Sequence, residues 1–133
     1  MGLTYRQQLD DAEAQLCRAI PGLQITSSGG ACPFQMDGLT PDGEEFYFRY
    51  RHDEAALYVY PAGKDLQDAH LYAELREATK AGWDRSELGP QEVVTLFQQL
   101  WKMLSPREQW PSTGVERLRA KVEVMVVAMR AKS

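Results

Sequence analysis

The sequence has few of the residues that mark a metal site or a disulfide framework. Among its 133 residues are only two cysteines and two histidines. Cys17 and Cys32 show neither Cys-x-x-Cys spacing nor a histidine at ligand spacing. The simplest prediction is two reduced thiols in a protein that holds no metal and no cofactor.

The chain also lacks a long apolar run. No segment approaches the roughly 18 to 20 consecutive apolar residues that are needed to cross a bilayer. Asp10, Asp11 and Glu13 lie where a secretory signal peptide would need apolar residues. We therefore expect a cytoplasmic protein with no membrane partner.

Positive charge is scarce as well. The net charge is −4, whereas binding to nucleic acid usually requires clustered lysine and arginine, so nucleic acid is not the expected partner. The charge is unevenly spread. Residues 1–46 carry two basic and seven acidic side chains, and residues 106–133 carry six basic and three acidic ones. Such a dipole can orient a protein partner or a second copy of the chain.

What the sequence does contain predicts a single α+β domain over residues 1–133. Its composition, 44% hydrophobic and 26% charged, is typical of a globular domain. Leu9, Ala12 and Leu16 recur at helical spacing. This spacing predicts a helix over about 4–20, which Thr4 caps and Pro21-Gly22 ends.

Alternating apolar residues then predict a run of strands. Short strands are expected at 23–25 and 32–36, the clearest strand at 45–51, and a further one at 57–60. Residues 40–43, Thr-Pro-Asp-Gly, predict a reverse turn. Because such short connections allow only antiparallel pairing, three or four strands should form an antiparallel β-meander.

The helical period returns in the second half of the chain. Apolar residues at scattered helical positions predict a helix over about 66–81, and a broad apolar stripe predicts one over 90–104, with Pro90 in the first turn. Residues 105–108 match a capping box and predict a short turn. A last helix is expected over about 114–131. Two or three of these helices should pack on the sheet.

The two central strands predict a surface of tyrosine and arginine. Phe46, Phe48 and Tyr50 should point into the core, because successive side chains of a strand face opposite ways. Tyrosine and arginine are favoured at protein interfaces. The competing interpretation is that a helix covers this face and leaves only its rim accessible. The candidate partner-binding residues on the outward face are Tyr47, Arg49, Arg51, Tyr58 and Tyr60.

Two further classes of function stay open. The first is a small anionic-ligand or nucleotide-binding domain that uses Arg49 and Arg51. The second is a hydrolase or transferase, which would need His52 or His70 to meet a cysteine or carboxylate through long-range folding. No sequence motif links either histidine to a nucleophile, so we expect a protein that is not an enzyme.

The last predicted helix is a second candidate surface. Its apolar seam is near heptad spacing and is flanked by basic residues, as in a helix that docks on a second chain. The alternative is that the seam packs on the sheet as part of the core. The residues expected to mediate self-association in a homodimer are Val115, Leu118, Val122, Met125 and Met129.

Short motifs over about residues 30–100 resemble small uncharacterised proteins of actinobacteria and their phages. They are Pro33-x-Gln35, Asp37-Gly38, Phe46-Tyr47-Phe48-Arg49-x-Arg51, Leu57-Tyr58-Val59 and Ala81-Gly82-Trp83. The resemblance implies a bacterial or phage accessory protein and no catalytic or binding residue. We therefore expect a non-enzymatic protein-interaction module. It would contact its partner through either the tyrosine and arginine surface or the last helix.

Overall fold

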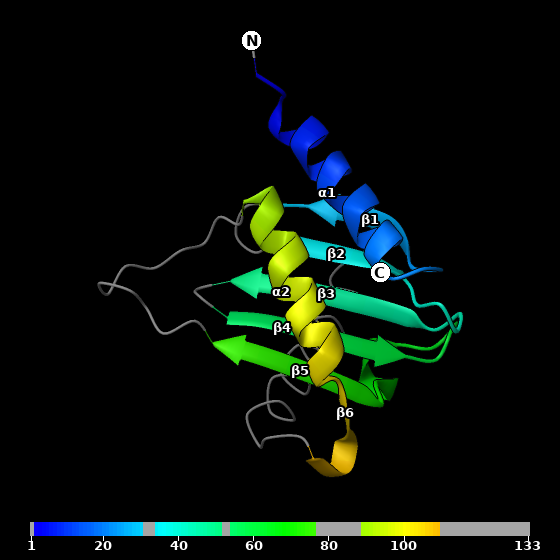
Figure 1. Ribbon diagram of the computed structural model, residues 1–133. Coiled ribbons are helices and arrows are strands. Elements are labelled where there is room, and N and C mark those ends of the chain that lie inside the picture. The colour runs from blue at the N-terminus through cyan, green and yellow to red at the C-terminus, as the bar shows by residue number, and fades with distance from the viewer. Residues whose placement is uncertain (1, 31–33, 52–53, 77–88, 110–133) are drawn as a thin grey trace, which may run out of the picture.

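The computed structural model describes residues 2–30, 34–51, 54–76 and 89–109 (Figure 1). These residues form an α+β fold in which one antiparallel sheet lies against two helices. In chain order the elements are α1 (Tyr5–Ala19), β1 (Gln24–Gly29), β2 (Phe34–Leu39), β3 (Glu45–Arg51), β4 (Glu54–Tyr60), η1 (Leu66–Asp68), β5 (Leu71–Arg76), α2 (Pro90–Met103), β6 (Ser105–Pro106) and η3 (Arg107–Gln109).

The strands of the sheet follow one another in chain order. The sheet has six strands in the order β1-β2-β3-β4-β5-β6, and every neighbouring pair is antiparallel. The predicted antiparallel α+β fold is therefore confirmed. The predicted number of three or four strands is too low, because β5 and the two-residue β6 extend the sheet beyond β4.

Helix α1 begins and packs as its sequence predicts. The Thr4 hydroxyl accepts a hydrogen bond from the Gln7 backbone N–H at 3.1 Å, and the Gln7 side chain accepts one from the Thr4 N–H at 2.9 Å. This capping box satisfies two amide groups that the first turn leaves without partners. Leu9, Ala12 and Leu16 are fully buried, so the spacing that predicted the helix also marks its packed side.

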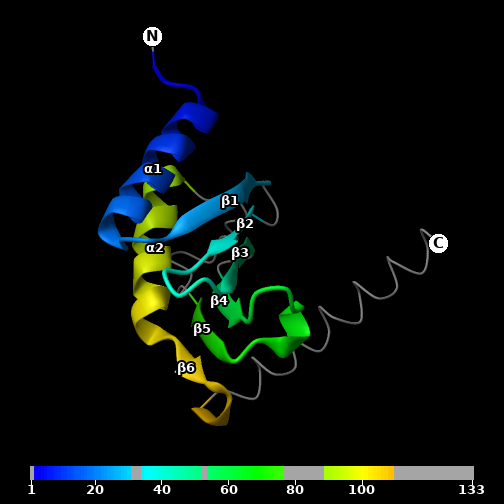
Figure 2. The same cartoon turned by 90° about the vertical axis from the view of Figure 1, so that its right-hand side faces the viewer.

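Helix α2 supplies the centre of the core. Pro90 stands at its first turn, as predicted, and the apolar stripe of the helix is buried. The Phe97 ring lies 5.2 Å from the Phe46 ring and 5.8 Å from the Phe48 ring, measured between ring centroids. Helices α1 and α2 pack against each other on one face of the sheet (Figure 2). The opposite face is thereby left to other segments.

The turn between β2 and β3 confirms the prediction for residues 40–43. The Gly43 N–H donates to the Thr40 carbonyl oxygen at 2.9 Å, and the Thr40 N–H donates to the Glu44 carbonyl oxygen at 2.7 Å. Gly43 has a φ of 82°, a conformation that glycine adopts without steric cost. The turn fixes the register in which Asp37 pairs with Tyr47.

The helix predicted over 66–81 is wrong. Residues 66–68 form the short 3-10 helix η1, and Leu71–Arg76 form strand β5, while residues 77–88 lie outside the described part of the chain. Leu71 and Leu75 are four residues apart, which suits a helix, but they are also two strand periods apart. Pairing with β4 decides between these conformations, because Tyr72 lies opposite Tyr58 in the ladder.

The segment after α2 was predicted in part. A short turn was expected over 105–108, and η3 provides it at Arg107–Gln109, whereas the pairing of Ser105 with Tyr72 in β6 was not expected. The helix predicted over 114–131 lies outside the described residues. The self-association residues predicted on it therefore stay a prediction.

We expect Gly38→Ala to destabilise the sheet strongly. A Cβ at this position would lie 2.5 Å from the Phe46 ring and still closer to the Gln24 carbonyl oxygen. Overpacking of this kind should lower the free energy of unfolding by about 3 kcal/mol, as measured by chemical denaturation. Gly2→Ala is the matched control, because a Cβ there meets nothing within 4 Å. Equal stability of the two variants would contradict the expected clash.

Candidate functional site

Strands β2 to β5 present chemically different side chains on the two faces of the sheet. Toward α1 and α2 the face is apolar and includes Phe34, Met36 and Phe48. The opposite face has a second, smaller buried cluster of its own, against which Tyr60 packs half-buried. We call this opposite face the tyrosine face; its buried cluster consists of Tyr47, Ala56, Tyr58, Leu66, Ala69 and Tyr72.

The strand register places the tyrosines in a row across the sheet. Tyr47 pairs with Tyr58, and Tyr58 pairs with Tyr72. The Tyr47 and Tyr58 rings stack with centroids 6.1 Å apart, and the Tyr58 and Tyr72 rings are 4.8 Å apart. The Tyr72 hydroxyl donates to a Glu74 carboxylate oxygen at 2.7 Å. The row continues on β2 with Asp37, which pairs with Tyr47 of β3.

The connection from β4 to β5 folds over the tyrosine face. Leu66 and Ala69 from this connection are buried against the tyrosines, and Figure 2 shows η1 on the side of the sheet opposite to α1 and α2. The Arg107 guanidinium group holds the connection from outside. It donates to the Ala69 carbonyl oxygen at 2.8 Å and to the Gln67 carbonyl oxygen at 2.6 Å. The connection therefore forms a fixed wall on this face.

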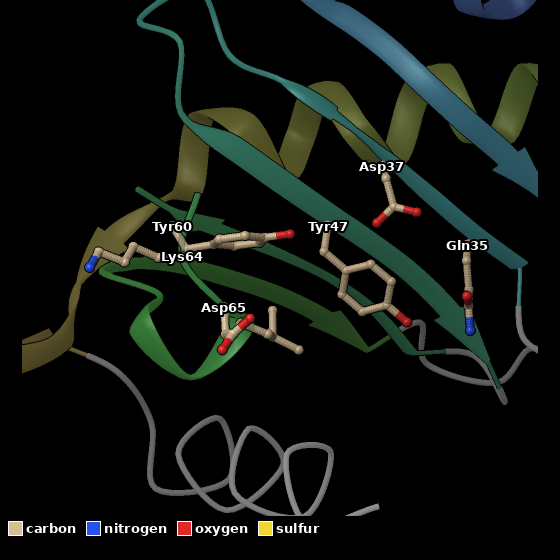
Figure 3. A pocket seen from close by; sticks show the side chains of 7 residues that line it. Gln35, Asp37, Tyr47, Tyr60, Lys64 and Asp65 are labelled. Carbon is tan, nitrogen blue, oxygen red and sulfur yellow. The ribbon is translucent and has the colours of Figure 1, made fainter. Parts of the chain in front are cut away.

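A pocket of ≈ 330 Å³ lies between this wall and the strands (Figure 3). Tyr47 and Tyr60 project into it from neighbouring strands, with the Asp37 carboxylate beside Tyr47. Its size lies at the lower end of the range for small-molecule sites. The lining residues come from β2, β3, β4, the β4–η1 connection and η1; they are Gln35, Asp37, Tyr47, Tyr60, Lys64, Asp65 and Leu66.

Both pocket tyrosines keep their phenolic protons at neutral pH. Burial raises the pKa of Tyr47 to about 12; Arg49 opposes this rise and Asp37 adds to it. Burial also raises the pKa of Tyr60, with further contributions from the carboxylates of Glu45 and Asp37. A protonated phenol is both a donor and an acceptor of hydrogen bonds. The pocket thus combines neutral aromatic rings with carboxylates.

The predicted tyrosine and arginine surface is only partly accessible. Tyr47 is 7% exposed and Tyr58 is 4% exposed, and among the described residues they are covered by the β4–β5 connection with its short η1, where the alternative had expected a helix. Arg49 and Tyr60 are half-buried, and Arg51 is exposed. Of these five residues the pocket brings together Tyr47 and Tyr60. Their role in binding a partner stays a prediction.

The two arginines predicted to hold an anion do not line the pocket. Arg49 lies opposite Gln35 in the ladder, and its Nε is buried without a hydrogen-bond partner among the residues that the structure describes. Arg51 lies opposite Glu54, whose carboxylate forms an ion pair with Arg76. The pocket is instead lined by two carboxylates and one ammonium group. Its charge does not favour an anion.

The histidine and cysteine candidates are dispersed. His70 contacts the Glu44 carboxylate, but neither residue lines the pocket. Cys17 lies on α1, across the sheet from the pocket, and burial raises the pKa of its thiol, with a further contribution from Glu13. His52 and Cys32 lie outside the described residues. Within the described ranges, no group of three or more His, Cys, Asp or Glu side chains is placed to hold a metal ion.

Sequence reasoning missed five of the seven lining residues. Gln35 and Asp37 alternate with Phe34 and Met36, so the strand period alone places them on the face away from the helices. No strand period places the other three residues, Lys64, Asp65 and Leu66, at the pocket. They reach it only because the chain after β4 folds back over the sheet. Local patterns do not encode that return.

Comparison with known proteins adds no relative to this picture. No protein-family model, no curated protein and no solved structure matches the chain. Among the described helices, none is long and apolar enough to cross a membrane.

We expect the stability of the fold to fall between pH 10 and pH 12, in part through Tyr47. The folded state raises the pKa of this phenol from 10.0 to about 12. In that interval the unfolded chain releases the proton and the folded chain keeps it, so unfolding becomes more favourable as pH rises. Tyr47→Phe should reduce the fall in unfolding free energy by about 1–2 kcal/mol, measured by urea denaturation at pH 10 and pH 12.

The control for this titration is Tyr5→Phe. Tyr5 is 49% exposed on α1, so removing its hydroxyl should leave the pH dependence close to that of the unaltered chain. If Tyr47→Phe and Tyr5→Phe gave the same pH dependence, the folded state would not hold the Tyr47 proton more tightly than the unfolded state does.

Proposed function

We propose that this chain is a non-enzymatic protein-interaction module that binds its partner at the pocket on the tyrosine face. The observation that carries the proposal is the pocket itself, which has two aromatic walls and convergent polar groups on the face that α1 and α2 leave uncovered. A concave pocket with a few convergent polar groups is the usual first candidate for a binding site in a domain. A bacterial or phage accessory protein is the biological setting that we propose for it.

Rigidity of the surroundings supports a binding role. The pocket floor consists of paired strands, with Gln35 opposite Arg49 and Asp37 opposite Tyr47. The β4–η1 connection is fixed at Gly63, whose N–H donates to a Glu45 carboxylate oxygen at 3.1 Å. Side chains held in this way lose little conformational entropy on binding, which favours affinity.

Tyr60 and Lys64 make the pocket reachable by a partner. Tyr60 is half-buried, and Lys64 is exposed at the end of the pocket in Figure 3. Tyrosine that is partly buried and partly accessible is enriched among residues that contribute most to protein interfaces. The fully buried Tyr58 and Tyr72 then act as support for the pocket wall.

Site-specific photo-crosslinking in the cells that produce the protein tests this proposal. A benzoylphenylalanine placed at Lys64 should give one discrete covalent adduct on irradiation, because this position borders the pocket. The same group at Gln99 is the matched control, since Gln99 is exposed on α2, on the other face of the sheet. Adducts are resolved by electrophoresis and identified by mass spectrometry.

The expected result is an adduct at position 64 that is absent at position 99. Tyr60→Ser in the position-64 protein should lower the adduct yield several-fold, because it removes one aromatic wall. Identical adducts from both positions, or none from position 64, would contradict a binding site at this pocket. Thermal unfolding of each variant, monitored by circular dichroism, verifies that the fold is retained.

A further inference from the structure

We infer that the occupant of this pocket is a positively charged side chain of the partner, an arginine guanidinium group. This inference deepens the proposed function and rests on it. Three properties of the pocket support it: the charge of the seven lining residues, the aromatic side chains among them, and the volume that they enclose.

The pocket carries carboxylates that no residue in the described ranges neutralises. Asp37 and Asp65 both line it, and neither forms an ion pair with any residue in the described part of the chain. The Asp37 carboxylate accepts one hydrogen bond from the Ser27 hydroxyl at 3.1 Å. The rest of this carboxylate's capacity to accept hydrogen bonds is available for a charged donor.

The one cation in the lining does not offset these charges. Lys64 is exposed, and Figure 3 shows its ammonium group at the end of the pocket far from Asp37. Solvent screens interactions between exposed charges that are well separated. Arg49 also acts on the Tyr47 phenol from beyond the lining. The preference for a cation therefore rests on the Asp37 carboxylate and the tyrosine rings that face the pocket.

Two tyrosine rings strengthen this preference for a cation. The Tyr47 and Tyr60 rings line the pocket beside the carboxylate. The face of an aromatic ring carries partial negative charge and attracts a cation within about 6 Å of its centre. The phenols are neutral, so the rings attract a cation through their faces and not through a phenolate charge.

Arginine fits this combination better than lysine does. A guanidinium group is planar, stacks on aromatic rings and donates two parallel hydrogen bonds to one carboxylate. Its aliphatic stem can lie along apolar surface, and Leu66 provides such a surface in the lining. A volume of ≈ 330 Å³ accepts one long side chain with part of its backbone.

Binding of a blocked amino acid to the full chain tests the inference. The probe is N-acetyl-arginine amide, and its neutral counterpart is the citrulline derivative, which keeps the shape and loses the charge. We expect the arginine probe to shift the backbone amide signals of Gln35, Tyr47 and Lys64 in two-dimensional NMR. The citrulline probe should bind at least about fivefold more weakly, the difference expected for a charge-assisted hydrogen bond.

Three variants make the test specific to this pocket. Asp37→Asn keeps the acceptor for Ser27 and should weaken arginine binding by about fivefold to tenfold, since it removes the charge. Lys64→Ala should leave arginine binding nearly unchanged, because solvent screens this exposed ammonium group from the inner pocket. Asp42→Asn is the matched control, as Asp42 is exposed in the β2–β3 turn and should leave binding unchanged.

The opposing outcomes are equally definite. Equal binding of the citrulline and arginine probes, or equal binding by Asp37→Asn and Asp42→Asn, would overturn the inference. The inference would also be overturned if a nucleotide such as AMP displaced the arginine probe and shifted the amide signals of the same pocket residues. A lysine probe that binds more tightly than the arginine probe would show that the occupant is an ammonium group, which also overturns it.

The two experiments fail in distinguishable ways. A crosslink at position 64 without arginine binding would leave the proposed function standing and reject the guanidinium occupant. Arginine binding without a crosslink at position 64 would reject the protein-binding function, because the pocket would then select a cation that no partner presents in the cell.

Discussion

The packing of Phe97 against Phe46 and Phe48 is the contact on which the rest of the structure depends. It fixes which face of β3 is inside, because a strand sends successive side chains to opposite sides. Once Phe46 and Phe48 face α2, Tyr47 must face away from it. The helices and the pocket are therefore two consequences of one alternation, and a change of register in β3 would abolish both.

The face that α1 and α2 leave free is not simply solvated. Burial of Tyr58 and Tyr72 under the β4–β5 connection gives this face a small core of its own. Aromatic pairs of this kind add to the stabilisation that burial provides. Arg107 then fixes the connection through two carbonyl oxygens. A pocket can persist here because a rigid floor and a held wall prevent the side chains from collapsing into it.

Local patterns in the sequence were sufficient for the elements whose period is unambiguous. Helix α1, with its Thr4 cap, and helix α2 are confirmed, as is the strand at 45–51. Strand β5 was predicted as a helix because the spacing of Leu71 and Leu75 satisfies both periods. Only the ladder with β4, a long-range contact, resolves this ambiguity. The two-residue β6 is too short to leave any pattern in the sequence.

The candidate site likewise has a part that local patterns predict and a part that depends on long-range contacts. Tyr47 and Tyr60 could be assigned to the outward face from alternation alone, whereas their burial could not, because it depends on where residues 64–69 return. The same return changes the chemistry of the site. An open face with Arg49 and Arg51 would attract anions, but the returning connection adds Asp65 to the lining, which then combines two carboxylates with the tyrosine rings. The preference for a cation that we propose therefore depends on the connection, which supplies Asp65, as well as on the strands, which supply Asp37 and the tyrosines.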